Sequence, residues 1–89
     1  MLAELEEILG QPFSVFPNPV REDLFIQFGN DNSNFEANYV LYNSLGQRVD
    51  FGTLEGSPAV IQVVDLDKGV YFLEVYFEGI FYGTKVVKV

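Results

Sequence analysis

The side chains that most often carry catalysis or bind transition metals are missing from this sequence. Its 89 residues include no histidine and no cysteine, so the chain has no imidazole base, no thiolate nucleophile and no usual ligand set for zinc or copper. An enzyme would need a carboxylate pair or a lysine, and the carboxylates fall on predicted turns and outward strand positions. The sequence therefore predicts a protein that is not an enzyme and that holds no metal or cofactor.

One loop is rich enough in oxygen-bearing side chains to raise the question of calcium. It is Asn30–Asn34. Counted from Asn30 as an EF-type loop, Phe35 stands where glycine is required and Leu41 where the closing glutamate is required. A solvated turn explains the composition better, and the same holds for Asp65 and Asp67, which flank a predicted Lys-Gly turn.

Aromatic side chains are the other group that could bind a ligand. Nine phenylalanines and five tyrosines make up 16% of the chain, and small β-domains can present such rings to sugars. Tyr76, Phe81 and Tyr82 are the candidates for a glycan-binding accessory module if their strands expose them. Most of the aromatic residues alternate as core residues do, so packing between strands is the stronger interpretation.

The charge of the chain argues against two classes of partner. Thirteen acidic and five basic residues give a formal charge of −8, whereas nucleic acids and anionic membranes are bound by clustered lysine and arginine. The charge is also uneven. Ile80–Val89 contains no acid and holds two of the three lysines, Lys85 and Lys88, so the terminal segment is the one basic part of an acidic chain.

Alternation of apolar and polar residues predicts strands along most of the sequence. The strongest signal is the terminal pair Val70–Phe77 and Ile80–Val89, which are separated only by Glu78-Gly79 and therefore predict a β-hairpin. The earlier strands are expected at 13–16, 23–28, 37–43, 47–52 and 59–64. About seven short strands without a confident helix are typical of an all-β fold, an antiparallel, Ig-like β-sandwich; a closed barrel is the alternative.

The two terminal strands differ in how clearly their faces can be assigned. In the first, Glu74 must face water. The residues that alternate with it then face the core: Tyr71, Leu73, Val75 and Phe77. In the second, Lys85 and Lys88 have opposite parity, so one of them points toward the buried side.

Residues 1–12 differ in character from the rest. Their helical spacing of leucines covers only nine residues before Gly10, and so short a helix is marginal alone in water. We expect 1–12 to be a linker or the tail of a preceding domain and 13–89 to be a single domain. The amino end lacks the basic-then-apolar order of a signal peptide, so an export signal would lie elsewhere.

Four short segments form an ordered set that ends at the carboxyl terminus. In Phe16-Pro17-Asn18-Pro19 each proline fixes its own φ and keeps the preceding residue extended, which predicts a stiff corner at a sheet edge rather than a contact site. Leu41–Val49 is a strand followed by a turn in which Gly46 can be left-handed. The last two segments contribute Leu66, Gly69 and Tyr71, and then Lys85-Val86-Val87-Lys88.

This ordered set resembles the type A C-terminal sorting domain of cargo proteins of the type IX secretion system, over Phe13–Val89. The first segment is similar to the family's Tyr-Pro-Asn-Pro start, with Phe16 in place of the commoner tyrosine. The second is similar to its strand, glycine turn and basic residue, although Asn43 stands where an acid is expected. The third matches its Leu-x-x-Gly-hydrophobic-Tyr strand and the fourth its Lys-apolar-apolar-Lys close.

The resemblance implies a non-catalytic address label of Gram-negative bacteria. A larger cargo domain would precede it in the same chain and be taken by the outer-membrane translocon to the cell surface or the medium, by way of the periplasm. A surface sortase would commonly cut ahead of the domain, near residues 1–12, and attach the cargo to lipopolysaccharide. No nucleic acid and no small-molecule substrate is implied.

The resemblance also implies roles for single residues. Those expected to be recognised by the secretion machinery are Lys85, Val86, Val87, Lys88 and Val89. Those expected to maintain the family fold are Phe16, Pro17, Asn18, Pro19, Gly46, Leu66, Gly69 and Tyr71. We expect recognition by strand addition at a sheet edge together with the lysine charges. An Ig-like structural spacer, whose carboxyl end would be replaceable, and the glycan-binding module are the other hypotheses.

Overall fold

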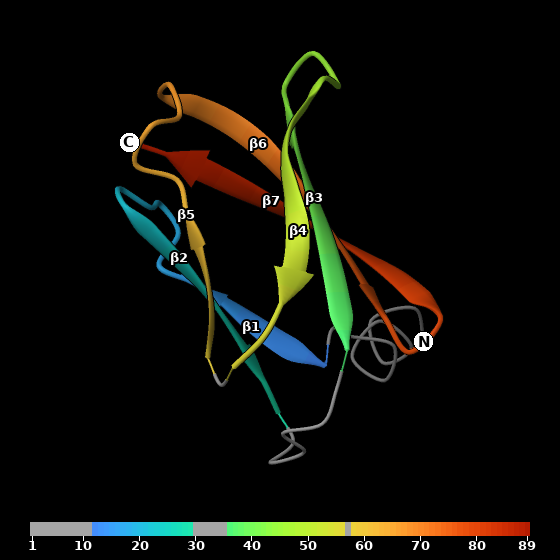
Figure 1. The fold of residues 1–89 in the computed structure, drawn as a ribbon. Helices are drawn as coiled ribbons and strands as arrows, with labels where there is room; N and C mark the ends of the chain where they lie inside the picture. The colour runs from blue at the N-terminus through green and yellow to red at the C-terminus, as the bar shows by residue number, and fades with distance from the viewer. Residues whose placement is uncertain (1–11, 30–35, 57) are drawn as a thin grey trace, which may run out of the picture.

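The computed structural model describes residues 12–29, 36–56 and 58–89 of the chain. Every regular element in these residues is a β-strand, as Figure 1 shows. The strands are β1 (Phe13–Phe16), β2 (Asp23–Phe28), β3 (Ala37–Asn43), β4 (Arg48–Leu54), β5 (Ala59–Gln62), β6 (Gly69–Phe77) and β7 (Ile80–Lys88). All seven predicted strands are confirmed. β4 extends past the predicted 47–52 because Leu54 is buried, and β5 stops at Gln62 rather than Val64 because the chain enters a turn.

The strands form two antiparallel sheets that face each other (Figure 1). One has the order β1-β2-β5 and the other β4-β3-β6-β7. Two separate sheets confirm the predicted β-sandwich and rule out the closed barrel. In the constant-type Ig arrangement the fourth strand joins the sheet of the first, second and fifth. Here β4 pairs instead with β3, so the second sheet gains a strand.

The core lies between the sheets and is built by alternation along each strand. The residues with almost no exposure come from both sheets: Leu24, Ile26, Leu41, Leu54, Ile61, Leu73, Val75 and Val86. The predicted phase of β6 is confirmed, because its four alternate apolar residues are buried while Phe72 and Tyr76 are exposed. Truncating one of the larger core residues to alanine costs about 2–5 kcal/mol, so these side chains contribute strongly to the position of β6.

The hairpin between β6 and β7 has the geometry that its two-residue loop predicts. Glu78 has a φ of 51° and Gly79 a φ of 80°. Positive φ at both central residues defines the type I′ turn, whose twist matches that of the flanking strands. The hairpin therefore pairs β6 with β7 in unbroken register from Gly69 opposite Lys88 to Phe77 opposite Ile80.

The parity of the two lysines is settled in β7. Val86 and Lys88 point into the sandwich, at 2% and 9% exposure, while Lys85 is exposed. Lys88 is thus the lysine that points toward the buried side. Its Nζ approaches the Val89 carbonyl oxygen at 3.5 Å, so the aliphatic stem is covered and the ammonium group reaches the end of the chain.

Candidate recognition surface around the terminal strand

β7 is an edge strand of its sheet, yet its outer edge is not open at the carboxyl end. The Val20 N–H donates to the Val87 carbonyl (2.8 Å), and the Val89 N–H donates to the Val20 carbonyl (2.9 Å). These bonds form a parallel bridge between Val20 and Lys88. Figure 1 shows the β1–β2 connection beside the carboxyl end. Val20 is 1% exposed, so this contact is anchored in the core.

Asn18 extends the contact by two further hydrogen bonds. Its Nδ2 donates to the Lys85 carbonyl (2.9 Å), and its Oδ1 accepts from the Val87 N–H (2.9 Å). A carboxamide carries one donor side and one acceptor side, as a peptide group does. The Asn18 side chain therefore occupies the place that a neighbouring strand would take. We call Asn18 and Val20 the edge clamp.

The prolines around Asn18 do not make these contacts themselves. Pro17 and Pro19 are exposed, and the peptide bonds that precede them are both cis. The predicted corner at a sheet edge is present, but the edge that it closes belongs to β7. For the expected strand addition at the edge of the terminal strand, the backbone groups from the Lys85 carbonyl to the Val89 N–H are already bonded.

The terminal segment Lys85–Val89 therefore offers a limited surface. Val86 and Lys88 are buried and the edge is bonded to the clamp. What faces solvent is the Lys85 side chain, part of Val87 and the terminal Val89, which is 42% exposed.

The outer face of the four-stranded sheet, directed away from the other sheet, carries Lys85 in a row of four residues. Strand pairing places Lys85 opposite Phe72, Phe72 opposite Tyr42, and Tyr42 opposite Arg48. We call these four residues the basic row. Arg48 reaches Tyr42 because a β-bulge shifts the register between Leu41 and Tyr42.

The basic row combines charge with one exposed ring, that of Phe72, and one half-buried ring, that of Tyr42. Phe72 is 48% exposed, and both Arg48 and Lys85 are exposed. The guanidinium carbon of Arg48 lies 4.9 Å from the centroid of the Phe51 ring, which is within the range of a cation–π contact. Phe51 itself is 64% exposed. The exposed aromatic rings of this part of the outer face thus lie near Arg48 on β4 at one side and Lys85 on β7 at the other.

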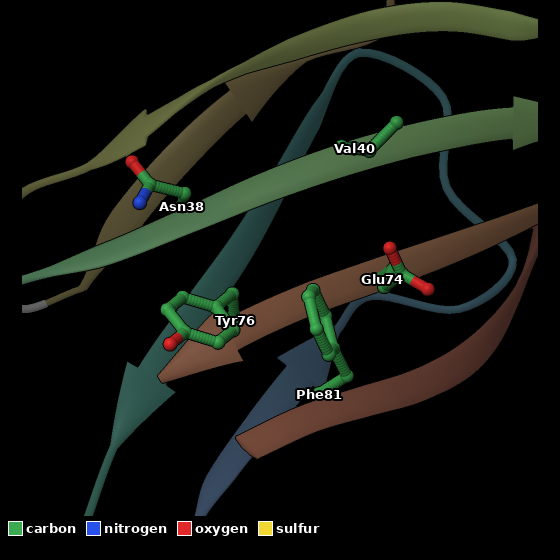
Figure 2. Close-up of a pocket in the computed structure, with 5 residues that line it drawn as sticks. All are labelled: Asn38, Val40, Glu74, Tyr76 and Phe81. Carbon is green, nitrogen blue, oxygen red and sulfur yellow. The ribbon is translucent and has the colours of Figure 1, made fainter. Parts of the chain in front are cut away.

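Farther along the same face lies an open pocket of about 390 Å³, drawn in Figure 2. Its lining residues, which we call the aromatic pocket, are Asn38, Val40, Glu74, Tyr76 and Phe81. The rings of Tyr76 and Phe81 lie 4.7 Å apart at 48°. The residue of β7 that lies opposite Glu74 is Gly83. Glycine has no side chain, and the space that a Cβ would fill there is open to 4 Å. The Glu74 carboxylate is therefore not covered from that position.

Two of the three aromatic candidates from the sequence thus reach solvent. Phe81 is 65% and Tyr76 39% exposed. Tyr82 has the other parity, is half-buried and packs edge-to-face on Phe13, with 5.6 Å between ring centroids.

Comparison with known protein families identifies the family of the chain. A family model described as a secretion system C-terminal sorting domain matches residues 14–89. The chain belongs to this family. It is a C-terminal sorting signal of type IX secretion, which carries a cargo protein to the cell surface or beyond the outer membrane of Gram-negative bacteria. The chain matches none of the curated proteins with which it was compared.

The sorting domain uses its Leu-x-x-Gly-hydrophobic-Tyr segment to hold the start of β6. The Tyr71 hydroxyl donates to the Asp67 carbonyl at 2.6 Å, which is the tyrosine corner of Ig-like sandwiches. Burial, and then the charge of Asp67, raises the pKa of Tyr71. Leu66 packs against the core, and Gly69 has a φ of 150°. Leu66 and Tyr71 therefore make contacts that stabilise the fold.

The glycine turn of the sorting domain is held by Asn43, where the family pattern suggests an acid. The Asn43 Oδ1 accepts from the N–H groups of Leu45 and Gln47, both at 3.0 Å, and its Nδ2 donates to the Gln47 Oε1 (2.8 Å). An aspartate could accept the same two bonds but could not donate the third. Gly46 is left-handed, with a φ of 81°, as predicted.

Phe16, the other departure from the family pattern, lies on the surface. It is 43% exposed, and its ring stacks on Phe25 with 5.7 Å between centroids. This ring contact needs no hydroxyl group, so a phenylalanine can make it.

Metal binding finds no support in the residues that the sorting domain's structure describes. Among them, no group of three or more acidic residues could hold an ion; Asn30–Asn34 lies outside the described ranges. In the same residues no helix is long and apolar enough to cross a membrane.

Sequence reasoning missed several residues of this surface. Val20 could have been suspected as a buried residue from its apolar side chain directly after the prolines. The partners of Lys85 in the basic row, and Asn38 and Val40 of the aromatic pocket, give no signal before the strand register is known.

Proposed function

We propose that Lys85–Val89 is the part of this sorting domain that the outer-membrane translocon recognises. The observation that carries the proposal is the edge clamp, whose four hydrogen bonds hold the chain end in one position on the sheet. A fixed segment binds a partner without first losing conformational entropy. Within it, Lys85 presents an exposed cation and Lys88 fills the sandwich.

We further propose that the domain is removed after transport. Residues 1–12 then serve as the link to a cargo domain that precedes them, and 13–89 as the transported label. A surface sortase would cut ahead of Phe13, where β1 begins, and join the cargo to lipopolysaccharide. Mass spectrometry of the surface-attached cargo would locate the new carboxyl end; a mature cargo that still contains residues 13–89 would contradict removal.

The recognition proposal is tested by delivery of a passenger. The chain is fused to a passenger with an export signal in a bacterium that has the secretion system, and surface passenger is measured with and without Lys85–Val89. We expect delivery with the whole domain and none after the deletion. Unchanged delivery after the deletion would overturn the proposal.

The deletion also removes Val86 from the core, so a second variant is needed. Lys85→Glu changes an exposed side chain and keeps the core intact. Its matched control is Lys68→Glu, at an exposed lysine in the turn before β6. We expect loss of delivery for the first variant only, with equal thermal stability of both.

The aromatic pocket favours glycan binding as a second candidate function. Two adjoining rings offer a stacking surface, and Asn38 and Glu74 beside them offer hydrogen bonds to hydroxyl groups. Glu74 is the one charged residue of the lining, so the pocket suits neutral rather than acidic sugars. A polysaccharide pull-down tests this: binding that Phe81→Ala abolishes and Phe51→Ala leaves intact supports it, and no binding to any neutral glycan contradicts it.

A further inference from the structure

The inference concerns how the terminal segment is recognised, and so it rests on the proposed function. A strand can be recognised through its backbone edge or through its side chains. From the Lys85 carbonyl to the Val89 N–H the outward backbone groups are already bonded: the Lys85 and Val87 carbonyls and the Val87 and Val89 N–H groups. A partner of the folded domain is therefore left with side chains.

Only one face of the segment can supply them. Val86 and Lys88 point into the sandwich. Lys85 and Val87 point to the outer face, where Lys85 lies opposite Phe72 and Val87 opposite Val70. The accessible part of the terminal segment is thus continuous with the basic row, which crosses all four strands of the sheet.

We propose that the translocon docks on the basic row, and that its docking surface is a folded protein surface with carboxylates on either side of an apolar patch. The row ends in Lys85 on β7 and Arg48 on β4, with Phe72 and Tyr42 between them. Three strand spacings of about 4.8 Å separate its ends. The partner's two acidic sites should therefore lie about 14 Å apart.

Charge complementarity supports this partner. The chain has a net charge of −8 and only five basic residues, and two of them flank the exposed Phe72 and the half-buried Tyr42. Aromatic residues at the centre and charges at the rim are the usual arrangement of a protein interface. The row also joins two of the sequence segments described above, since Arg48 follows the glycine turn and Lys85 belongs to the terminal one.

The test measures surface delivery of the passenger fusion with single variants of the whole chain. Arg48→Glu lies on a different strand from the terminal segment, so it probes the row without touching β7. We expect about a tenfold loss of delivery, similar to that of Lys85→Glu. Arg21→Glu and Lys68→Glu, at exposed basic residues elsewhere, are the matched controls and should remain within about twofold.

The aromatic centre of the row is tested by the pair Phe72→Ala and Phe81→Ala. Both residues are exposed on the outer face, but Phe81 belongs to the aromatic pocket. We expect reduced delivery for Phe72→Ala and normal delivery for Phe81→Ala. Equal loss in both variants would overturn the row as the docking site and favour the pocket.

Asn18→Ala separates recognition of side chains from recognition of the edge. It frees the Lys85 carbonyl and the Val87 N–H for a partner strand. Docking on the row predicts no gain in delivery, whereas a gain would show that the edge is recognised and would overturn the inference.

Failure of the inference and failure of the proposed function are distinguishable. If deletion of Lys85–Val89 stops delivery but Arg48→Glu and Phe72→Ala deliver normally, the row is wrong and the terminal segment stands. If the deletion variant is delivered normally, the proposed function fails. Thermal unfolding of each variant confirms that the domain is intact.

Discussion

The two ends of β7 are built from similar apolar residues but have opposite environments. At its start Ile80 is 53% and Phe81 65% exposed; at its end Val86 is 2% exposed. The same neighbour, β6, pairs with both ends. Phe81 is exposed because it lies on the outer face. Ile80 and Val86 share the inner face of the strand, and between these two the difference follows the other edge, where the clamp residues Asn18 and Val20 bond only to the last residues. Local hydropathy alone therefore does not say which end of a strand is structural and which is surface.

The two ends of β7 also present different kinds of surface. The fastened end presents one cation, Lys85, in a fixed position, while the turn end presents two rings beside a carboxylate. A fixed charge suits selective docking of a protein, and an open aromatic pocket suits a small or flexible ligand.

The largest difference in stability between the two ends of β7 is expected when one side chain at each end is truncated to alanine. Val86→Ala takes away two buried methyl groups and should lower the free energy of unfolding by about 2 kcal/mol. Phe81→Ala removes more atoms but should cost less than about 1 kcal/mol, because its ring is 65% exposed and packs on the exposed ring of Tyr76. Urea unfolding of both variants checks this; equal costs would contradict the contrast between the ends.

The next test opens the clamp without disturbing the core. Asn18→Ala removes two hydrogen bonds from β7 and should cost about 1–2 kcal/mol. Hydrogen exchange should speed up at the Val87 amide, which loses its acceptor, and stay slow at the β6 amides. Asn38→Ala, at an exposed asparagine of the outer face, is the control. If the Val87 amide exchanges at the wild-type rate in Asn18→Ala, the clamp does not fasten the strand.

A smaller effect is expected at the tyrosine corner, whose Tyr71 pairs with the carboxyl-terminal half of β7. Tyr71 lies opposite Val86 in the pairing of β6 with β7. Tyr71→Phe keeps the buried ring but removes the bond to the Asp67 carbonyl, which should cost about 1 kcal/mol. Thermal unfolding measures it. Tyr76→Phe, whose ring is exposed at the turn end, should change stability by less, and the reverse order would argue against the comparison.

The last test concerns the opposite edge of the sheet, where no effect is expected at neutral pH and one appears only at alkaline pH. The Tyr39 hydroxyl donates to the Asp50 Oδ2 (2.9 Å). Burial, and then this bond and the Asp50 charge, raises the pKa of Tyr39 from 10.0 to about 12. Its folded-state pKa lies above the unfolded value, so its stabilising contribution is complete below pH 10 and is lost as the pH rises from 10 to about 12.

Tyr39→Phe removes this titration. Over the same pH interval the variant should lose less stability than the wild type, as measured by urea unfolding at successive pH values. Parallel losses in the two proteins would show that Tyr39 ionises as readily folded as unfolded.

The strands, the terminal hairpin and the buried phase of β6 were predictable from the sequence because they depend on local patterns. Alternation has a period of two residues, and Glu78-Gly79 supplies both residues that a type I′ turn needs. The ordered segments from Phe16 to Lys88 likewise led to the correct family, since they are strings of neighbouring residues.

The recognition surface depended on the tertiary structure. The bond from the Val87 N–H to Asn18 joins residues 69 positions apart, and no local pattern encodes such a distance. The parity of Lys85 and Lys88 was ambiguous until the pairing with β6 settled it. The basic row depends on a β-bulge that brings Arg48 opposite Tyr42.

The sequence by itself thus determined which segments become strands and which family the chain belongs to, whereas the tertiary structure decided which groups of the terminal strand a partner can reach. The physical reason is that strand formation follows from side-chain alternation within a few residues. Accessibility instead depends on register and on which distant backbone groups complete the hydrogen bonds of a sheet edge.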